Sequence, residues 1–166
     1  SVGYKDELVL PLRITPRGNG QIALKTEMQL GLCKDLCLPH TLKIDATLPA
    51  GGKPDPRIAA AMASAPFSEA EASVRAGRCT VSPAKRGLKL RAEIDMPTRG
   101  QVHTVVETAN PQVWVAEPVT SQAEGRIVTE TRLAHMDGRA FALDRSGLRI
   151  TVLGDGQAVD IHGCDR

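Results

Sequence analysis

The sequence predicts a mainly β protein built as a β-sandwich, with one or two short helices in a connecting segment. Apolar and polar residues alternate over several stretches, which indicates strands with one buried and one solvated face. These stretches recur about every 8–12 residues, with Gly and Asn turns between them, as in β-sandwiches. Helix start signals are confined to residues 56–76.

The first 48 residues predict a three-stranded meander. Every second residue is apolar in three stretches, Leu8–Ile14, Ile22–Leu32 and Leu42–Leu48. Residues 15–20 are rich in Pro and Gly and can close a hairpin. Pro11 has no backbone N–H, so we expect the first strand at a sheet edge or with a bulge. Such a meander has too little surface to be stable by itself.

A linker rich in Pro and Gly follows at residues 49–56, and helix signals come directly after it. Asp55 can cap a helix that has Pro56 as its first residue. Ser68 and Glu71 match a capping box, and Gly77 can end a helix. We therefore expect one or two short helices between residues 56 and 76.

The strand pattern resumes at Cys79. Residues 154–156 read as the last hairpin turn. The predicted division is residues 1–50, a helical linker at 51–78, and a second β region at 79–166. The strands expected in this last region are Leu88–Met96, Val102–Thr108, Val113–Glu117, Ile127–Leu133, Ala140–Leu143, Leu148–Leu153 and Ala158–His162.

The composition argues against a nucleic-acid partner. The chain has 21 basic and 19 acidic residues, a net charge of +2. The four aromatic residues, Tyr4, Phe67, Trp114 and Phe141, offer few platforms for stacking bases. No apolar run approaches the roughly 18 residues that span a bilayer. No Gly-rich phosphate loop joins a strand to a helix, so we expect no nucleotide or other cofactor.

The four cysteines, Cys33, Cys37, Cys79 and Cys164, are the most informative residues. Cys33 and Cys37 flank Lys34, Asp35 and Leu36, between two stretches of matching alternation. A three-residue hairpin loop would place them opposite one another, with Cα atoms about 4.5 Å apart. A disulfide needs about 4.4–6.8 Å, so this pair can bond at an exposed sheet end.

The two possible disulfides differ in what they would stabilise. On the chain-entropy model, closing the five residues from Cys33 to Cys37 contributes only about 2 kcal/mol. A Cys79–Cys164 bond would contribute about 4.6 kcal/mol and is the better structural bridge. The Cys33–Cys37 bond would add little stability, and its exposed position favours thiol–disulfide exchange. Lys34 would stabilise a nearby thiolate, whereas Asp35 would oppose it.

Other interpretations remain open for these residues. Cys33 and Cys37 can be a plain hairpin clip or, less simply, half of a zinc site with His40. With a histidine they also form a soft ligand set that suits Cu(I), as in a copper-handling module. A structural β-sandwich adaptor with two inert bridges is a further alternative. Cys79 and Cys164 can also be separate buried thiols.

Two stretches carry a family resemblance. Residues 3–12 (GYKDELVLPL) and 31–39 (GLCKDLCLP) resemble the periplasmic N-terminal domain of DsbD-type thiol:disulfide interchange proteins. They are most similar to the ScsB branch, in which a Cys-Lys-Asp-x-Cys-x-Pro loop is typical. The similarity covers residues 1–48, and the later regions resemble the second periplasmic subdomain of ScsB-like proteins.

The resemblance implies an immunoglobulin-like fold and a redox relay in the periplasm, in a soluble domain of an inner-membrane protein. Its partners would be a membrane-embedded redox domain of the same protein and periplasmic thioredoxin-like disulfide proteins. Cys33 and Cys37 would be the catalytic pair: Cys37 would form the mixed disulfide and Cys33 would resolve it. Tyr4 could shield the pair, and Pro39 and His40 would lie near it.

The resemblance also has departures. Some DsbD members place five residues between these cysteines. The cap loop and acidic pair of the family lie upstream of the Tyr4 position. Residues 1–50 would then be the C-terminal part of a redox β-domain that lacks its early strands, and residues 79–166 a second sandwich. We therefore expect an exposed or unusually covered sheet face near residues 8–46.

Overall fold

The computed structural model describes residues 3–16, 18, 20–49, 51–154 and 156–164. The chain divides into unit 1 (Ser1–Ser64) and unit 2 (Ala65–Arg166). The sequence had suggested a separate linker at residues 51–78. Within the described residues, the helix falls in unit 1 and residues 65–78 fall in unit 2.

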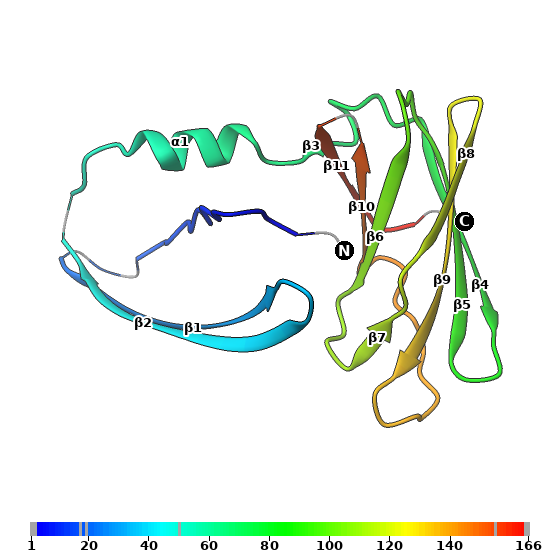
Figure 1. The fold of residues 1–166 in the computed structure, drawn as a ribbon, viewed down its shortest axis with the longest axis horizontal. Coiled ribbons are helices and arrows are strands. Elements are labelled where there is room, and N and C mark those ends of the chain that lie inside the picture. The colour runs from blue at the N-terminus through cyan, green and yellow to red at the C-terminus, as the bar shows by residue number, and fades with distance from the viewer. Residues whose placement is uncertain (1–2, 17, 19, 50, 155, 165–166) are drawn as a thin grey trace. The chain divides into compact units, whose positions relative to one another are not determined.

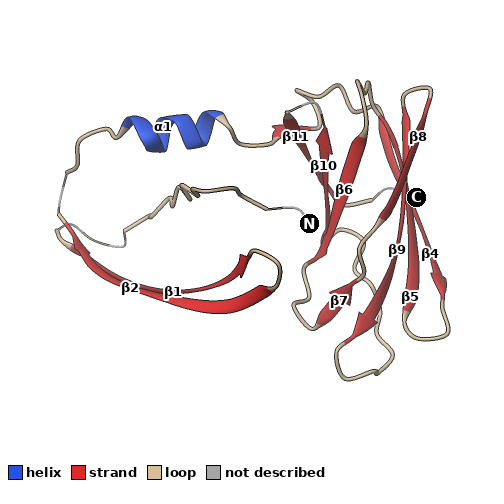
Figure 2. Ribbon diagram, in the orientation of Figure 1, coloured by secondary structure: helices blue, strands red, loops and turns tan. Residues whose placement is uncertain are grey.

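Unit 1 consists of a long β-hairpin and a short helix (Figures 1 and 2). Strands β1 (Ile22–Cys33) and β2 (Cys37–Leu48) pair antiparallel along their whole length, from Ile22 opposite Leu48 to Cys33 opposite Cys37. Helix α1 (Pro56–Ala63) begins as predicted: the Asp55 carboxylate accepts a hydrogen bond from the Arg57 N–H at 2.8 Å. No described residue of unit 1 is buried.

The prediction of a first strand of the meander at Leu8–Ile14 is wrong. This segment forms no ladder, and Leu8, Leu10 and Leu12 are exposed by 41%, 52% and 53%. Alternation marks one apolar side of a segment, but a strand also needs a hydrogen-bonded neighbour, and Pro11 removes one donor. The predicted turn at residues 15–20 lies partly outside the described residues.

Unit 2 is a sandwich of two mainly antiparallel sheets, which fits the predicted immunoglobulin-like architecture (Figure 1). One sheet has the order β3-β11-β10-β6. The other has the order β4-β5-β9-β7, with β8 also paired to β9. The strands are β3 (Phe67–Ser68), β4 (Ala76–Pro83), β5 (Leu88–Asp95), β6 (Val102–Thr108), β7 (Val113–Val115), β8 (Val119–Ala123), β9 (Arg126–His135), β10 (Leu148–Gly154) and β11 (Gln157–His162).

The core of unit 2 lies between the two sheets, where alternate residues point inward. Leu90 and Ile94 on β5 and Ile127 on β9 are fully buried, and they pack with Leu148 and Ile150 on β10. This buried set contains aliphatic side chains rather than aromatic rings, in agreement with the few aromatics in the chain. The strand alternation predicted this core face correctly.

One helix, α1, forms where one or two were expected between residues 56 and 76, and two further predictions, for Gly77 and for Ala140–Leu143, need correction. The Ser68–Glu71 capping contacts form, with the Ser68 N–H donating to Glu71 Oε2 at 2.8 Å, but no second helix follows. Ser73 has a φ of 54°, which ends the turn, and Gly77 lies inside β4 rather than at a helix end. The stretch Ala140–Leu143 is not a strand, although Phe141 and Leu143 pack against the core.

Candidate functional site

The tip of the β1–β2 hairpin holds Cys33 and Cys37 directly opposite each other. Their Cα atoms are 4.0 Å apart, and the two residues form a disulfide. The intervening loop is held by the Lys34 N–H, which donates to the Leu36 carbonyl at 3.3 Å. The predicted hairpin and the predicted bond are both present, because equal alternation on the two strands sets the register.

The disulfide is accessible at the surface of unit 1. Both cysteines are exposed, and Leu36 between them is 72% exposed. Gly31 precedes Cys33 on the same face, and a methyl group at Gly31 would lie 3.9 Å from Cys33 Sγ. The absence of a side chain at Gly31 therefore leaves open space beside the sulfur.

The cysteines lie on the polar face of the hairpin. Residues directly opposite each other in an antiparallel pair share a face, and the face alternates along each strand. The face of the cysteines also carries two ion pairs, Lys43–Glu27 at 3.5 Å and Lys25–Asp45 at 3.4 Å. These ion pairs are largely exposed and contribute little stability.

The other face of the hairpin is apolar and incompletely covered. Near the tip, Leu32 and Leu38 lie opposite each other and are 57% and 60% exposed. Farther along, Met28 lies opposite Leu42, which is 40% exposed. The expectation of an exposed sheet face near residues 8–46 therefore holds for this hairpin.

The structure brings only some of the predicted auxiliary residues to the cysteines. Lys34 and Asp35 lie in the loop between them, and Pro39 lies opposite Gly31, one pair along on the same face. His40 lies opposite Leu30, on the apolar face away from the sulfurs. Tyr4 is 79% exposed, whereas a ring that covered the disulfide would lose more of its surface.

The position of His40 also bears on the metal alternatives. A Cu(I) or zinc site built from Cys33, Cys37 and His40 needs the three side chains on one side of the hairpin. The register places the imidazole on the opposite side. Within the described residues, no three His, Cys, Asp or Glu side chains gather in a metal-binding arrangement.

The second disulfide joins Cys79 to Cys164 in unit 2, with Cα atoms 5.4 Å apart. Cys79 lies on β4 in one sheet and is 6% exposed, and Cys164 follows β11 of the other sheet. This bond links the two sheets across a long loop. The two disulfides therefore differ in burial as well as in loop length.

Sequence reasoning missed three residues around the cysteines. Leu36 lies in the loop between the cysteines, and Leu32 and Leu38 are their neighbours along the strands, on the apolar face. All three are exposed, although alternation assigned Leu32 to a core face. The signal was present in the segment Gly31–Pro39, where a leucine precedes Cys33, another lies between the cysteines, and a third follows Cys37. Their exposed apolar surface lies at the tip of the hairpin.

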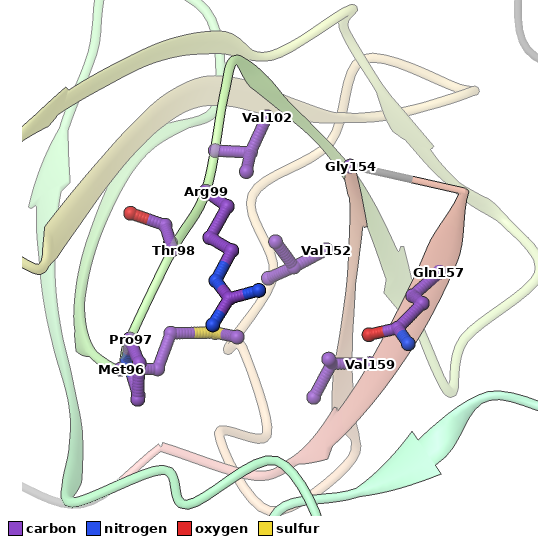
Figure 3. Close-up of a pocket in the computed structure, with 9 residues that line it drawn as sticks. All are labelled: Met96, Pro97, Thr98, Arg99, Val102, Val152, Gly154, Gln157 and Val159. Atoms are coloured by element: carbon purple, nitrogen blue, oxygen red, sulfur yellow. The ribbon is translucent and has the colours of Figure 1, made fainter.

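Unit 2 has hollows of its own. One hollow, of about 240 Å³, lies at the end of the sandwich where β5 leads into β6 (Figure 3). It is lined by Met96, Val102, Val152 and Val159, with the Arg99 side chain extending among them. Its lining residues include no Cys, His, Asp or Glu.

A comparison with solved structures found a neighbour for this fold. The crystal structure of the N-terminal periplasmic domain of ScsB from Proteus mirabilis superposes with a TM-score of 0.59 and 16% sequence identity. The chain is similar in fold to that domain. The match covers 84% of this chain and 56% of the ScsB domain, so this chain spans little more than half of its neighbour's length.

Comparisons of the sequence itself gave no match: no protein-family model fits the chain, and no curated protein is similar enough to be matched. The fold likeness to ScsB agrees with the resemblance seen in residues 3–12 and 31–39. Among the described residues, no helix has both the length and the apolar character needed to cross a bilayer.

Proposed function

We propose that this chain is a periplasmic thiol–disulfide exchange domain. It receives electrons from a membrane-embedded redox domain of the same protein and passes them to thioredoxin-like disulfide proteins. The observation that carries the proposal is the exposed Cys33–Cys37 disulfide at the hairpin tip, where a thiolate of another protein can reach a sulfur. The fold likeness to a periplasmic ScsB domain supports the location.

The exchange proceeds in two balanced halves. A dithiol of the membrane domain attacks the Cys33–Cys37 bond, and its second thiol resolves the mixed disulfide, which leaves two thiols on the hairpin and a disulfide on the donor. The Cys37 thiolate then attacks the disulfide of a substrate protein. The Cys33 thiolate attacks Cys37 Sγ, restores the hairpin disulfide and releases the substrate as a dithiol. Two electrons and two protons pass in each half.

Energetics agree with a bond that opens and closes. The Cys33–Cys37 bond spans a sequence separation of 4, so it restricts the unfolded chain little and contributes about 2 kcal/mol on the entropy model. No described residue around it is buried, so opening it exposes no core. Cys79–Cys164, in contrast, has one sulfur in the core of unit 2.

A redox titration tests the proposal. The protein is equilibrated in glutathione or dithiothreitol buffers, and free thiols are counted by alkylation and mass spectrometry. We expect Cys33 and Cys37 to titrate reversibly well above roughly −300 mV, with Cys79 and Cys164 still bonded. A hairpin pair that stays oxidised until the protein unfolds would instead support the inert adaptor.

Mixed-disulfide trapping tests the roles of the two cysteines. The variant Cys33→Ser should hold partners through Cys37, because the resolving thiol is gone. Cys37→Ser is the matched control and should trap little. Trapping by Cys37→Ser alone would reverse the assignment, and trapping by neither variant would contradict the exchange function.

A further inference from the structure

One end of unit 2 gathers basic side chains from three segments. The turn between β4 and β5, strand β7 and the connection that follows β9 meet there, at the lower end of the sandwich in Figure 1. Pairing fixes this meeting: Val113 on β7 lies opposite His135, and Leu88 on β5 lies opposite Leu133. We call six of its residues the basic end: Lys85, Arg86, Trp114, Arg132, Met136 and Arg139.

Two hollows lie beside the β4–β5 turn at this end, of about 720 Å³ and 600 Å³. Lys85 and Arg86 line both of them. Arg139 and His135 also line the first, and Lys89, Arg132 and Trp114 line the second. Neither hollow has a carboxylate among its lining residues, so both present positive charge to an incoming ligand.

Most of these cations have no acidic partner. Within the part of the chain that the structure describes, Lys89 is bound to Glu130 at 2.9 Å, while Lys85, Arg86, Arg132 and Arg139 are in no ion pair. One acidic residue, Asp137, lies in the same connection as Met136 and Arg139, and its carboxylate is 3.7 Å from His135 Nδ1. The basic end therefore carries four cations that are in no ion pair among the described residues, against the single carboxylate of Asp137 in the same connection.

Arg139 is held in place by groups without a negative charge. Its Nε–H donates to Nε2 of His135 at 3.0 Å, and Nη2 donates to Oε1 of Gln112 at 3.1 Å. His135 is 4% exposed and anchored in β9. A guanidinium oriented in this way can still donate to a phosphate oxygen with its remaining N–H groups.

Exposed apolar side chains accompany the charges. Trp114 is 59% exposed and Met136 is 72% exposed, and neither belongs to the buried core of unit 2. Tryptophan prefers the boundary between lipid headgroups and acyl chains, and basic residues are attracted to anionic headgroups. Trp, Met and Arg are also frequent in protein–protein interfaces, so an acidic protein is the alternative that the test below separates from a lipid surface.

We propose that the basic end of unit 2 binds the surface of a membrane rich in anionic phospholipids. Lys85, Arg86, Arg132 and Arg139 contact headgroup phosphates, and Trp114 and Met136 reach the boundary with the acyl chains. Binding of this kind is peripheral and weakens as salt increases. It involves no cysteine, so it stands or falls independently of thiol exchange.

The single tryptophan of the chain makes the test direct, because all tryptophan emission comes from Trp114. The full chain is mixed with two kinds of vesicle. One contains phosphatidylcholine alone, and the other also contains about 30–40% phosphatidylglycerol, which makes its surface strongly negative. With the anionic vesicles we expect a blue shift, quenching by brominated acyl chains, and loss of both at about 0.5 M salt. With the zwitterionic vesicles we expect no change.

Variants locate the contact. Lys85→Glu with Arg86→Glu should weaken vesicle binding at least about tenfold, and Lys85→Gln with Arg86→Gln by less, both measured by co-sedimentation. The matched control, Lys53→Glu with Arg99→Glu, makes the same change in net charge on exposed residues elsewhere and should bind nearly as the parent does. Circular dichroism and thermal unfolding confirm that each variant is folded.

Three results would overturn the proposal. The first is no binding to anionic vesicles at low salt. The second is an equal loss of binding in the control and the test variants, since this would show attraction by net charge alone. The third is binding to polyglutamate without binding to vesicles, which would point to an acidic protein as the partner. A Cys33→Ser, Cys37→Ser variant should bind vesicles as the parent does.

Discussion

Asp160 on β11 lies between two basic side chains. Arg149 donates two hydrogen bonds to its carboxylate at 2.7 Å, and Nε2 of His162 lies 3.1 Å from Oδ2. The hydrogen bonds from Arg149 are the main cause that lowers the pKa of Asp160, and the positive charges of Arg149 and His162 lower it further. The side chain is only 15% exposed, so solvent screens this cluster less than a surface pair.

The consequence is a pH-dependent contribution to stability. A carboxylate whose pKa is lower in the folded state stabilises the fold above its unfolded pKa, and this stabilisation is lost as the pH falls through the folded pKa. We expect Asp160→Asn to reduce the free energy of unfolding by about 1–2 kcal/mol at pH 7. Urea titrations should show this difference shrinking below about pH 4 and vanishing once the parent carboxylate is protonated.

Glu107→Gln is the control for Asp160→Asn. Glu107 also faces Arg149, but at 3.9 Å, and its side chain is 55% exposed. The substitution Glu107→Gln should therefore change the free energy of unfolding by less than about 0.5 kcal/mol. Equal effects of the two substitutions would contradict a specific role for Asp160.

Gly87 shows how one missing side chain shapes the β4–β5 turn. Its φ is +86°, and a Cβ atom there would collide with the carbonyl of Leu133 on β9. We expect Gly87→Ala to lower the free energy of unfolding by more than about 2 kcal/mol, because strain and a backbone clash add. Gly100 also has a positive φ, but a Cβ atom there would have no neighbour within 4 Å. Gly100→Ala should therefore lower the free energy of unfolding by only about 1 kcal/mol in the same chemical unfolding experiment.

At the scale of elements, the two disulfides should differ in their contributions to stability. Cys79–Cys164 spans a sequence separation of 85 and links the two sheets, so replacing both cysteines by Ala should cost roughly 2–4 kcal/mol. The same replacement of Cys33 and Cys37 should cost no more than about 2 kcal/mol. Denaturant midpoints of unit 2, followed by Trp114 fluorescence, measure the first effect, and circular dichroism measures the second. A larger loss from the hairpin pair would contradict this assignment.

At the scale of the whole molecule, the two units differ in how they are stabilised. Unit 2 has a buried core from both sheets, whereas no described residue of unit 1 is buried. A two-stranded hairpin with one exposed apolar face is marginal in water. We expect a fragment of residues 65–166 to unfold cooperatively, and its Trp114 fluorescence should change at the same denaturant concentration as in the full chain. A fragment of residues 1–64 should show no cooperative transition by circular dichroism, and a sharp one would show that unit 1 has a core of its own.

The sequence predicted those parts of the fold in which local pattern and tertiary environment agree. Val102–Thr108 was predicted with the bounds of β6, because its alternate residues are buried in the core. The segment Leu8–Ile14 has equal alternation but no ladder, since the pattern does not reveal whether a partner strand exists. β8 was missed because Thr120, Ser121 and Gln122 carry no apolar alternation. β8 is instead held to β6 by a hydrogen bond between the hydroxyl groups of Thr120 and Thr104, whose oxygens are 2.8 Å apart.

The candidate site was predictable to a similar extent. The spacing of Cys33 and Cys37 predicted the hairpin disulfide, since loop length and register are local properties. The role of His40 was not predictable from proximity in sequence, because one residue along a strand changes the face. The basic end of unit 2 was not predicted at all. Its members come from the β4–β5 turn, β7 and β9, and only the fold brings them together.

The strand register also has a kinetic consequence for Cys33 and Cys37. The ladder that places these residues opposite each other continues along both strands from Cys33–Cys37 to Ile22–Leu48, so we expect the backbone of the intact chain to keep the two side chains close after reduction. The second thiol therefore acts at a very high effective concentration on any adduct formed by the first. A covalent complex with a partner should be short-lived, and turnover should be limited by the encounter of the two proteins rather than by their separation.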